Sequence, residues 1–169
     1  MITFNLTGLD NVLNRLRQID LDRMCLDTST TLAAEIKQRV HTRGEASDGS
    51  QIGIYSDGYM KVRTGNFKSD KIVRGKNKGG ARPKYNRTSD TRVVLSLTRQ
   101  MENDLKGNIK TPNGYGIGFS NELNYQKALW QDDTKGKHRY KKPIWELSEY
   151  EKQIANETVR NHLQKLNLL

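Results

Sequence analysis

The sequence contains a single cysteine, Cys25, among its 169 residues. One thiol excludes an internal disulfide and any zinc site built from several cysteines. Cys25 lies within a helical pattern of apolar residues, so we expect an inert, buried thiol. The first residues, Met1-Ile-Thr-Phe-Asn-Leu, also lack the basic start and the apolar run of a secretory signal.

Long apolar runs are missing as well. No stretch approaches the roughly 18 apolar residues of a membrane-spanning helix. We therefore expect a soluble protein made in a reducing cytoplasm. Apolar residues make up 34% of the chain, which is slightly low for a globular domain that is stable alone even when glycine is added. A chain with a modest core often completes its stability by assembling with other chains.

The sequence also lacks the motifs of common catalytic sites. It has no P-loop, no Gly-x-Ser-x-Gly elbow and no His-Glu-x-x-His motif. The histidines at positions 41, 138 and 162 lie far apart, and none has a second ligand at metal spacing. Asp132-Asp133 followed by His138 is the only candidate for a nuclease metal site, and charge balance within a lysine-rich loop explains it more simply. We expect no enzyme activity, no cofactor and no metal.

Positive charge is concentrated in one segment, residues 61–92. This segment holds eleven Lys or Arg and two acids, Asp70 and Asp90, so it carries a net +9 of the +10 of the whole chain. Glycines and few apolar residues accompany the charge, so the segment cannot form a core of its own. A loop of this length inside a compact domain is usually functional. The sequence predicts an inserted basic arm, residues 61–92, which becomes ordered by what it touches.

The basic side chains of this arm are the candidate partner-binding residues. Lysines and arginines near Tyr55, Tyr59, Phe67 and Tyr85 suit contacts with nucleic-acid phosphates and bases. An acidic protein surface suits them equally well, and charge alone does not separate the two partners. The candidates are Lys61, Arg63, Lys68, Lys71, Arg74, Lys76, Lys78, Arg82, Lys84 and Arg87.

Two helices are predicted before the arm. The first follows an extended piece at residues 3–6 and is indicated by the helical spacing of Leu9, Val12, Leu13, Leu16 and Ile19. The second runs from Leu21 past Val40, with Asp20 or Asp22 as its N-terminal cap. It should end near Gly44, where turn residues begin.

Strands and short helices are predicted after the arm. Residues 92–97, with Val93 and Val94, indicate a strand, and residues 98–105 a short helix or turn. A turn at residues 111–114 leads into a second strand at 115–119. A further short helix is expected at 124–130, with its apolar side turned inward, namely Tyr125, Ala128 and Leu129.

The last helix has the clearest local signal. Ser148-Glu-Tyr-Glu forms a capping box, in which Ser148 and Glu151 satisfy each other's backbone amides. An apolar stripe follows it to the end of the chain. The predicted fold is a single α+β domain, residues 1–169, with two N-terminal helices, a small antiparallel sheet carrying the long inserted basic arm, and a C-terminal helix packed on the sheet.

Four segments, in this order, carry a resemblance to a known family. They are Ile54-Tyr-Ser-Asp-Gly-Tyr-Met-Lys-Val-Arg, Leu95-Ser-Leu-Thr-Arg-Gln-Met, Gly116-Ile-Gly-Phe and Pro143-Ile-Trp-Glu-Leu-Ser-Glu-Tyr-Glu. With the two N-terminal helices, they resemble the virion morphogenesis proteins of tailed bacteriophages, the neck and tail-completion proteins, over roughly residues 8 to 165. Arg99 and Glu146 stand where that family pattern has glycine.

The resemblance implies a structural protein of the virion without catalysis. It implies a ring of identical subunits, most simply a hexamer by analogy, at the head–tail joint, assembled in the cytoplasm of the host bacterium. Its partners would be adjacent neck, connector or tail-tube proteins, with contact to the passing DNA as a further option. The alternative function is a small nucleic-acid-binding protein that uses residues 61–92. Most of the arm is expected to contact protein, because a strongly basic lumen would hinder the passage of DNA.

Overall fold

The computed structural model describes residues 7–85, 87, 89–96, 98–132, 140 and 142–166. The predicted extended piece at residues 3–6 lies outside this part, as do Asp133 and His138. In chain order the elements are α1 (Thr7–Leu16), α2 (Leu21–Lys37), the π-helix η1 (Gln38–Arg43), α3 (Asp57–Thr64), α4 (Gln100–Asp104), β1 (Leu105–Thr111), β2 (Gly114–Phe119), α5 (Glu122–Asp132) and α6 (Glu149–Lys165).

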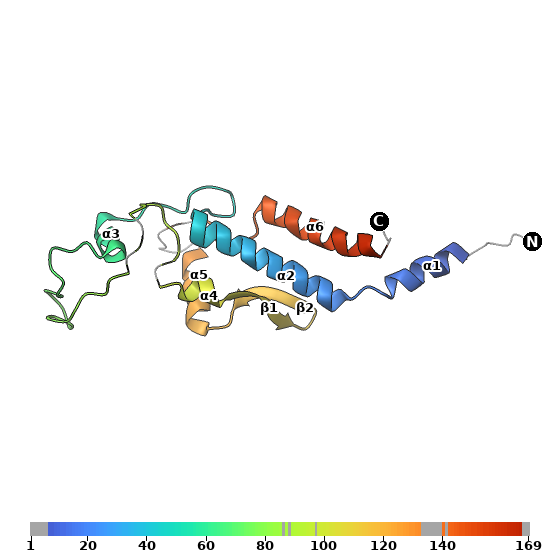
Figure 1. Ribbon diagram of the computed structural model, residues 1–169, viewed down its shortest axis with the longest axis horizontal. Coiled ribbons are helices and arrows are strands. Elements are labelled where there is room, and N and C mark those ends of the chain that lie inside the picture. Colours follow the sequence, from blue (N-terminus) through green and yellow to red (C-terminus); the bar gives the residue numbers. More distant parts are fainter. Residues whose placement is uncertain are drawn as a thin grey trace, which may run out of the picture.

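The long helix α2 is the centre of a mixed α+β fold. The antiparallel β1–β2 hairpin packs on one side of α2 and α6 on the other, as Figure 1 shows. The predicted cap Asp20 is confirmed, because its carboxylate accepts a hydrogen bond from the Arg23 amide at 3.0 Å. The predicted end is confirmed too: η1 continues α2 to Gly44, which has a left-handed φ of 70°.

The strand β1 of the hairpin approaches α2 very closely. A Cβ at Gly107 would overlap the backbone carbonyl of Ser29, so only glycine fits there. The Ser29 hydroxyl in turn donates to the Gly107 carbonyl. The register pairs Leu105 with Phe119 and Thr111 with Gly114, with an irregularity between Lys106 and Ile109. The predicted turn at residues 111–114 and the strand after it are confirmed.

The prediction of a strand at residues 92–97 is wrong for the described residues 92–96. Arg92 makes one isolated bridge, to Ile54, and the chain then turns where the Ser96 amide donates to the Val94 carbonyl at 2.7 Å. The carbonyls of Val94 and Ser96 accept from the side chains of Tyr55 and Arg63 instead of from a neighbouring strand. Leu97 lies outside the described residues.

The C-terminal helix packs along α2, and the prediction that it packs on the sheet is wrong. The confirmed capping box at Ser148 starts α6 at a buried ion pair with Arg39 at the start of η1. Toward its other end, His162 Nε2 lies 3.1 Å from a carboxylate oxygen of Asp27 on α2. These contacts hold α6 along α2, and Figure 1 shows the hairpin across α2 from it.

The buried core is small and lies around the end of α2. Its centre is formed by Ile36, Val40, Ala46, Ile52, Tyr55, Val93, Leu105 and Ile144. The short helix predicted around residues 124–130 is confirmed as α5, where Ala128 is buried but Tyr125 and Leu129 remain exposed. None of the helices that the structure describes combines the length and the apolar character needed to cross a bilayer.

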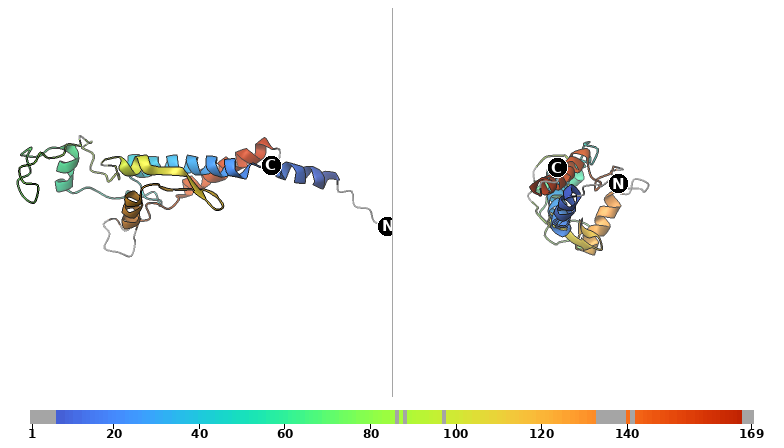
Figure 2. Two further views of the ribbon diagram at one scale, coloured as in Figure 1. Left: turned by 90° about the horizontal axis from the view of Figure 1, so that it is seen from below. Right: turned by 90° about the vertical axis from the view of Figure 1, so that its right-hand side faces the viewer.

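The molecule is elongated, with α1 projecting at one end and α3 and the basic arm at the other (Figures 1 and 2). Its accessible surface is 11,964 Å², whereas a compact monomer of 19.4 kDa would expose about 8,500 Å². An elongated chain exposes more surface than a compact one of the same mass.

Candidate partner-binding site

The two ends of the basic arm are held side by side. The Tyr55 amide donates to the Thr91 carbonyl at 2.8 Å, and the Val93 amide donates to the Gly53 carbonyl at 2.8 Å. The bridge between Ile54 and Arg92 lies between these two bonds. This backbone pairing makes residues 56–90 an excursion that leaves the body and returns at one place.

Arg63 fixes the base of the excursion from within. It is 1% exposed, and its guanidinium lies 4.4 Å from the ring centroid of Tyr55. Its Nη1 donates to the Tyr55 hydroxyl at 3.1 Å, and its carbonyl accepts from the Arg87 amide at 2.9 Å. The Arg63 side chain is buried and hydrogen-bonded within the protein. Its burial therefore does not fit the partner-binding role expected for it.

Tyr55 completes the base. Its hydroxyl donates to the Val94 carbonyl, and burial raises the pKa of Tyr55 to about 12. The side chain therefore stays protonated and remains a donor at any physiological pH. Tyr59 lies against it, with ring centroids 4.9 Å apart. The two tyrosines expected near a nucleic-acid contact instead serve as packing at the base of the arm.

The outer part of the arm is a small hairpin-like turn. Lys71 and Ala81 form an isolated bridge, and the Ile72 amide donates to the Gly80 carbonyl at 2.8 Å. Arg82 places its guanidinium 4.4 Å from the ring centroid of Phe67 and donates to the Ser69 carbonyl at 3.1 Å. The guanidinium of Arg82 thus covers a face of the Phe67 ring.

The structure separates the ten candidate residues into two groups. Arg63 is buried and Arg82 and Arg87 are partly buried, with Arg82 and Arg87 bonded within the arm and its base. Lys84 is exposed and pairs with Asp70 at 3.0 Å. The remaining side chains extend along the surface of α3 and the arm and are exposed, namely Lys61, Lys68, Lys71, Arg74, Lys76 and Lys78.

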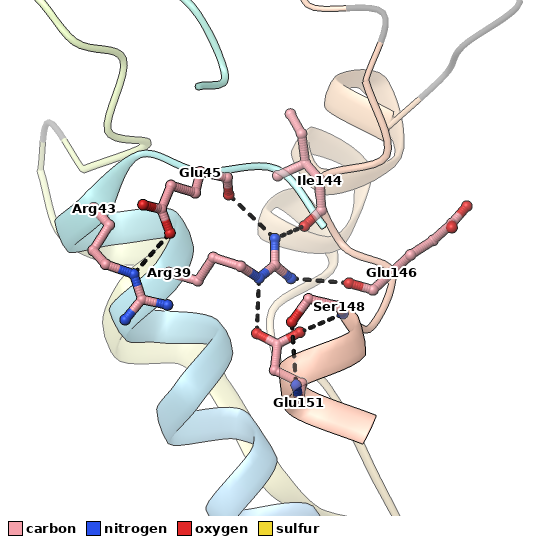
Figure 3. Close-up of polar contacts among 7 residues, drawn as sticks. All are labelled: Arg39, Arg43, Glu45, Ile144, Glu146, Ser148 and Glu151. Atoms are coloured by element: carbon pink, nitrogen blue, oxygen red, sulfur yellow. Dashed lines mark hydrogen bonds and ion pairs between the residues drawn. The ribbon is translucent and has the colours of Figure 1, made fainter. Parts of the chain in front are cut away.

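A second polar cluster, which the sequence analysis missed, anchors the body (Figure 3). Arg39 and Glu151 are 2% and 1% exposed and pair at 2.8 Å. Arg39 also donates to the backbone carbonyls of Glu45, Ile144 and Glu146. Glu151 accepts from the Ser148 amide at 2.7 Å. The cluster joins η1, the segment before α6 and α6 itself.

One sequence signal could have revealed this cluster. Arg39 interrupts the apolar spacing of the second predicted helix, between Ile36 and Val40. A charged residue on an apolar stripe needs a buried partner. The capping-box carboxylate of Glu151, which is itself buried, satisfies that need.

The chain bends at Arg99, directly before α4. Arg99 has a φ of 60°, the left-handed conformation that glycine favours, and α4 begins directly after it.

Within the described residues, no group of three or more His, Cys, Asp or Glu gathers as a metal site would require.

No family model matches this chain, and no curated protein and no solved structure matches it significantly.

Proposed function

We propose that this protein is a structural subunit of a tailed-bacteriophage virion, a ring-forming neck or tail-completion protein that joins the tail to the DNA-filled head. The observation that carries the proposal is the basic arm, an anchored projection at one end of an elongated body. The resemblance of four ordered segments to virion morphogenesis proteins supports it further.

The arm is built to reach a partner outside its own chain. Its base is fixed by backbone pairing and by Arg63, while six cations stay exposed on α3 and the arm. Exposed charges steer encounter with an oppositely charged surface and set its register. The arm adds little to the core, so its benefit lies in association.

The body also suits a subunit that is completed by neighbours. Several large apolar side chains remain exposed, among them Ile54, Leu123, Leu129 and Trp130. Exposed apolar surface of this kind marks interaction sites on soluble proteins. Together with the elongated shape, this exposed apolar surface supports a subunit that contacts neighbours, as in a closed ring, and by analogy the ring would contain six copies.

A nucleic-acid-binding protein is the alternative, and the aromatic residues of the arm disfavour it. Tyr55 and Tyr59 pack at the base, and Arg82 covers Phe67. Stacking of bases on aromatic rings, which supports single-strand binding, therefore has few free rings here. Contact of the exposed lysines with phosphate is the form of this alternative that the geometry favours.

The experiment uses the phage that carries the gene. Removing the gene should leave DNA-filled heads and separate tails in the lysate, and adding the purified protein should restore joined, infectious particles. Joined particles without the protein would overturn the proposal.

Duplex binding separates the alternative. A purified ring subunit should form oligomers without nucleic acid and bind a short duplex weakly at 200 mM salt. A nucleic-acid binder should show a log-affinity that falls against log salt by roughly 0.9 for each phosphate contacted. Tight, steeply salt-dependent binding by a monomer would favour the alternative.

A further inference from the structure

An apolar groove of about 530 Å³ opens between α2, the hairpin, α5 and α6. Met24 and Cys25 line it from α2, Ile117 from β2 and Val159 from α6. On the α5 side Tyr125 and Leu129 form its wall, and both remain exposed. The groove is thus open on one side and apolar, as sites that receive a helix are.

The helix α1 has the opposite property, an apolar stripe without a surface to cover it. Leu13 and Leu16 lie one turn apart on one face and are 40% and 47% exposed. Figures 1 and 2 show α1 projecting beyond the end of α2, away from the rest of the chain. A helix of ten residues is marginal in water unless its apolar face is packed.

We propose that the groove of one copy receives α1 of a second copy. Two features support this occupant: the groove lacks an apolar cover, and α1 lacks an apolar floor. Figure 2 shows α1 extending away from the body of its own chain, so α1 does not cover the groove of that chain. α1 spans about 15 Å, and Leu13 and Leu16 lie only about 4.5 Å apart along its axis, so one groove can take both leucines.

The contact would be heterologous, since it joins two different surfaces of the chain. Such contacts, repeated around an axis, generate closed rings. The inference therefore deepens the proposed ring and rests on it for the number of copies, whereas the helix-in-groove contact itself stands on the groove and α1. The test distinguishes the two.

The single cysteine makes the contact directly testable. Cys25 lines the groove, so Leu16→Cys places a second thiol on the face of α1 that should enter it. Under a mild oxidant such as diamide, the full-length variant should form disulfides between chains and give a ladder on a non-reducing gel. The matched control is Asn14→Cys, which lies on the other side of α1 and should give no ladder beyond that of the unmodified protein.

Each outcome decides the inference. Adding Cys25→Ser to Leu16→Cys should abolish bands above two chains, since only pairs of α1 could then react. A disulfide within one chain, seen by mass spectrometry, would show α1 folding back on its own groove and would overturn the inference. A ladder that stops at two chains, and that Cys25→Ser removes, would support the contact but contradict the proposed ring.

Sedimentation gives a second measurement that needs no cross-link. The double variant Leu13→Asp, Leu16→Asp should sediment as a monomer. Its near-UV circular dichroism, which reports the packing of the core aromatic residues, should stay unchanged, because α1 lies outside the core. Asn11→Asp with Asn14→Asp adds the same charge on polar positions and should leave the oligomer intact. Equal oligomer size in both variants, or a monomeric unmodified protein at 50 μM, would overturn the inference.

Discussion

The buried pair of Arg39 and Glu151 allows a sharp stability prediction. Replacing Glu151 by Gln removes the negative charge but keeps an amide that still serves at this position of a capping box. Arg39 then stays 2% exposed with its charge unpaired, although its three carbonyl contacts remain. Breaking one side of a buried pair costs 3–5 kcal/mol, and the retained contacts favour the lower end, about 3 kcal/mol.

The assay is chemical denaturation followed by circular dichroism, at a fixed chain concentration. A loss of about 3 kcal/mol corresponds to a fall in Tm of roughly 6–12 °C for a domain of this size. The slope of the free energy of unfolding against denaturant concentration should stay the same, since the surface exposed on unfolding does not change.

The same helix offers a matched control. Glu149→Gln removes a carboxylate that is 85% exposed and pairs with Lys152 at 2.7 Å in the first turn of α6. A surface pair of this kind contributes little to stability, because water screens both charges. If Glu151→Gln destabilised the protein no more than Glu149→Gln, Arg39 would have to reach water, and the anchoring role of the cluster would be refuted.

Three further predictions follow from the hairpin, the core histidine and the arm. Gly107→Ala should lower the free energy of unfolding by about 1–3 kcal/mol in denaturation, because its Cβ would overlap the backbone of α2. Burial lowers the pKa of His41, so the unfolded state binds the proton more readily, and Tm should fall as the pH drops from about 7 to 5. Reversing charge at Arg74, Lys76 and Lys78 should leave the Tm unchanged but produce unjoined heads and tails in electron micrographs.

Each of these predictions has a control. Gly58→Ala adds a Cβ in open space on α3 and should change stability by less than about 1 kcal/mol, so an equal loss in both glycine variants would contradict the close approach. His41→Gln should weaken the dependence of Tm on pH, and an unchanged dependence would place its cause elsewhere. Normal joined virions from the arm variant would remove the arm from the joining step.

The sequence by itself determined the features that depend on neighbouring residues. The Asp20 cap, the capping box of Ser148 and Glu151, the turn at 111–114 and the end at Gly44 each involve a few adjacent positions, whose chemistry is sufficient to fix them. The concentration of charge in residues 61–92 is likewise a sequence property. Its outer cations are exposed, and their partner stays a prediction.

Tertiary structure decided the features whose sequence signal was weak or misleading. β1 is polar and contains Gly107 and Asn108, so its strand depends on packing against α2 and on pairing with β2 rather than on local propensity. The β-branched residues Val93 and Val94 indicated a strand, but side chains of the arm base occupy the nearby carbonyls.

The same reason explains the two arginines whose roles the sequence did not reveal. Arg63 belongs by charge to the arm and by contact to the core, because Tyr55, from the segment before the arm, and Ser96, 33 residues after Arg63, lie around it. Arg39 finds Glu151 at a separation of 112 residues, and that pair places α6 on α2 rather than on the sheet. Charge and spacing identify which side chains are polar, whereas only the assembled fold determines which of them are removed from water and paired.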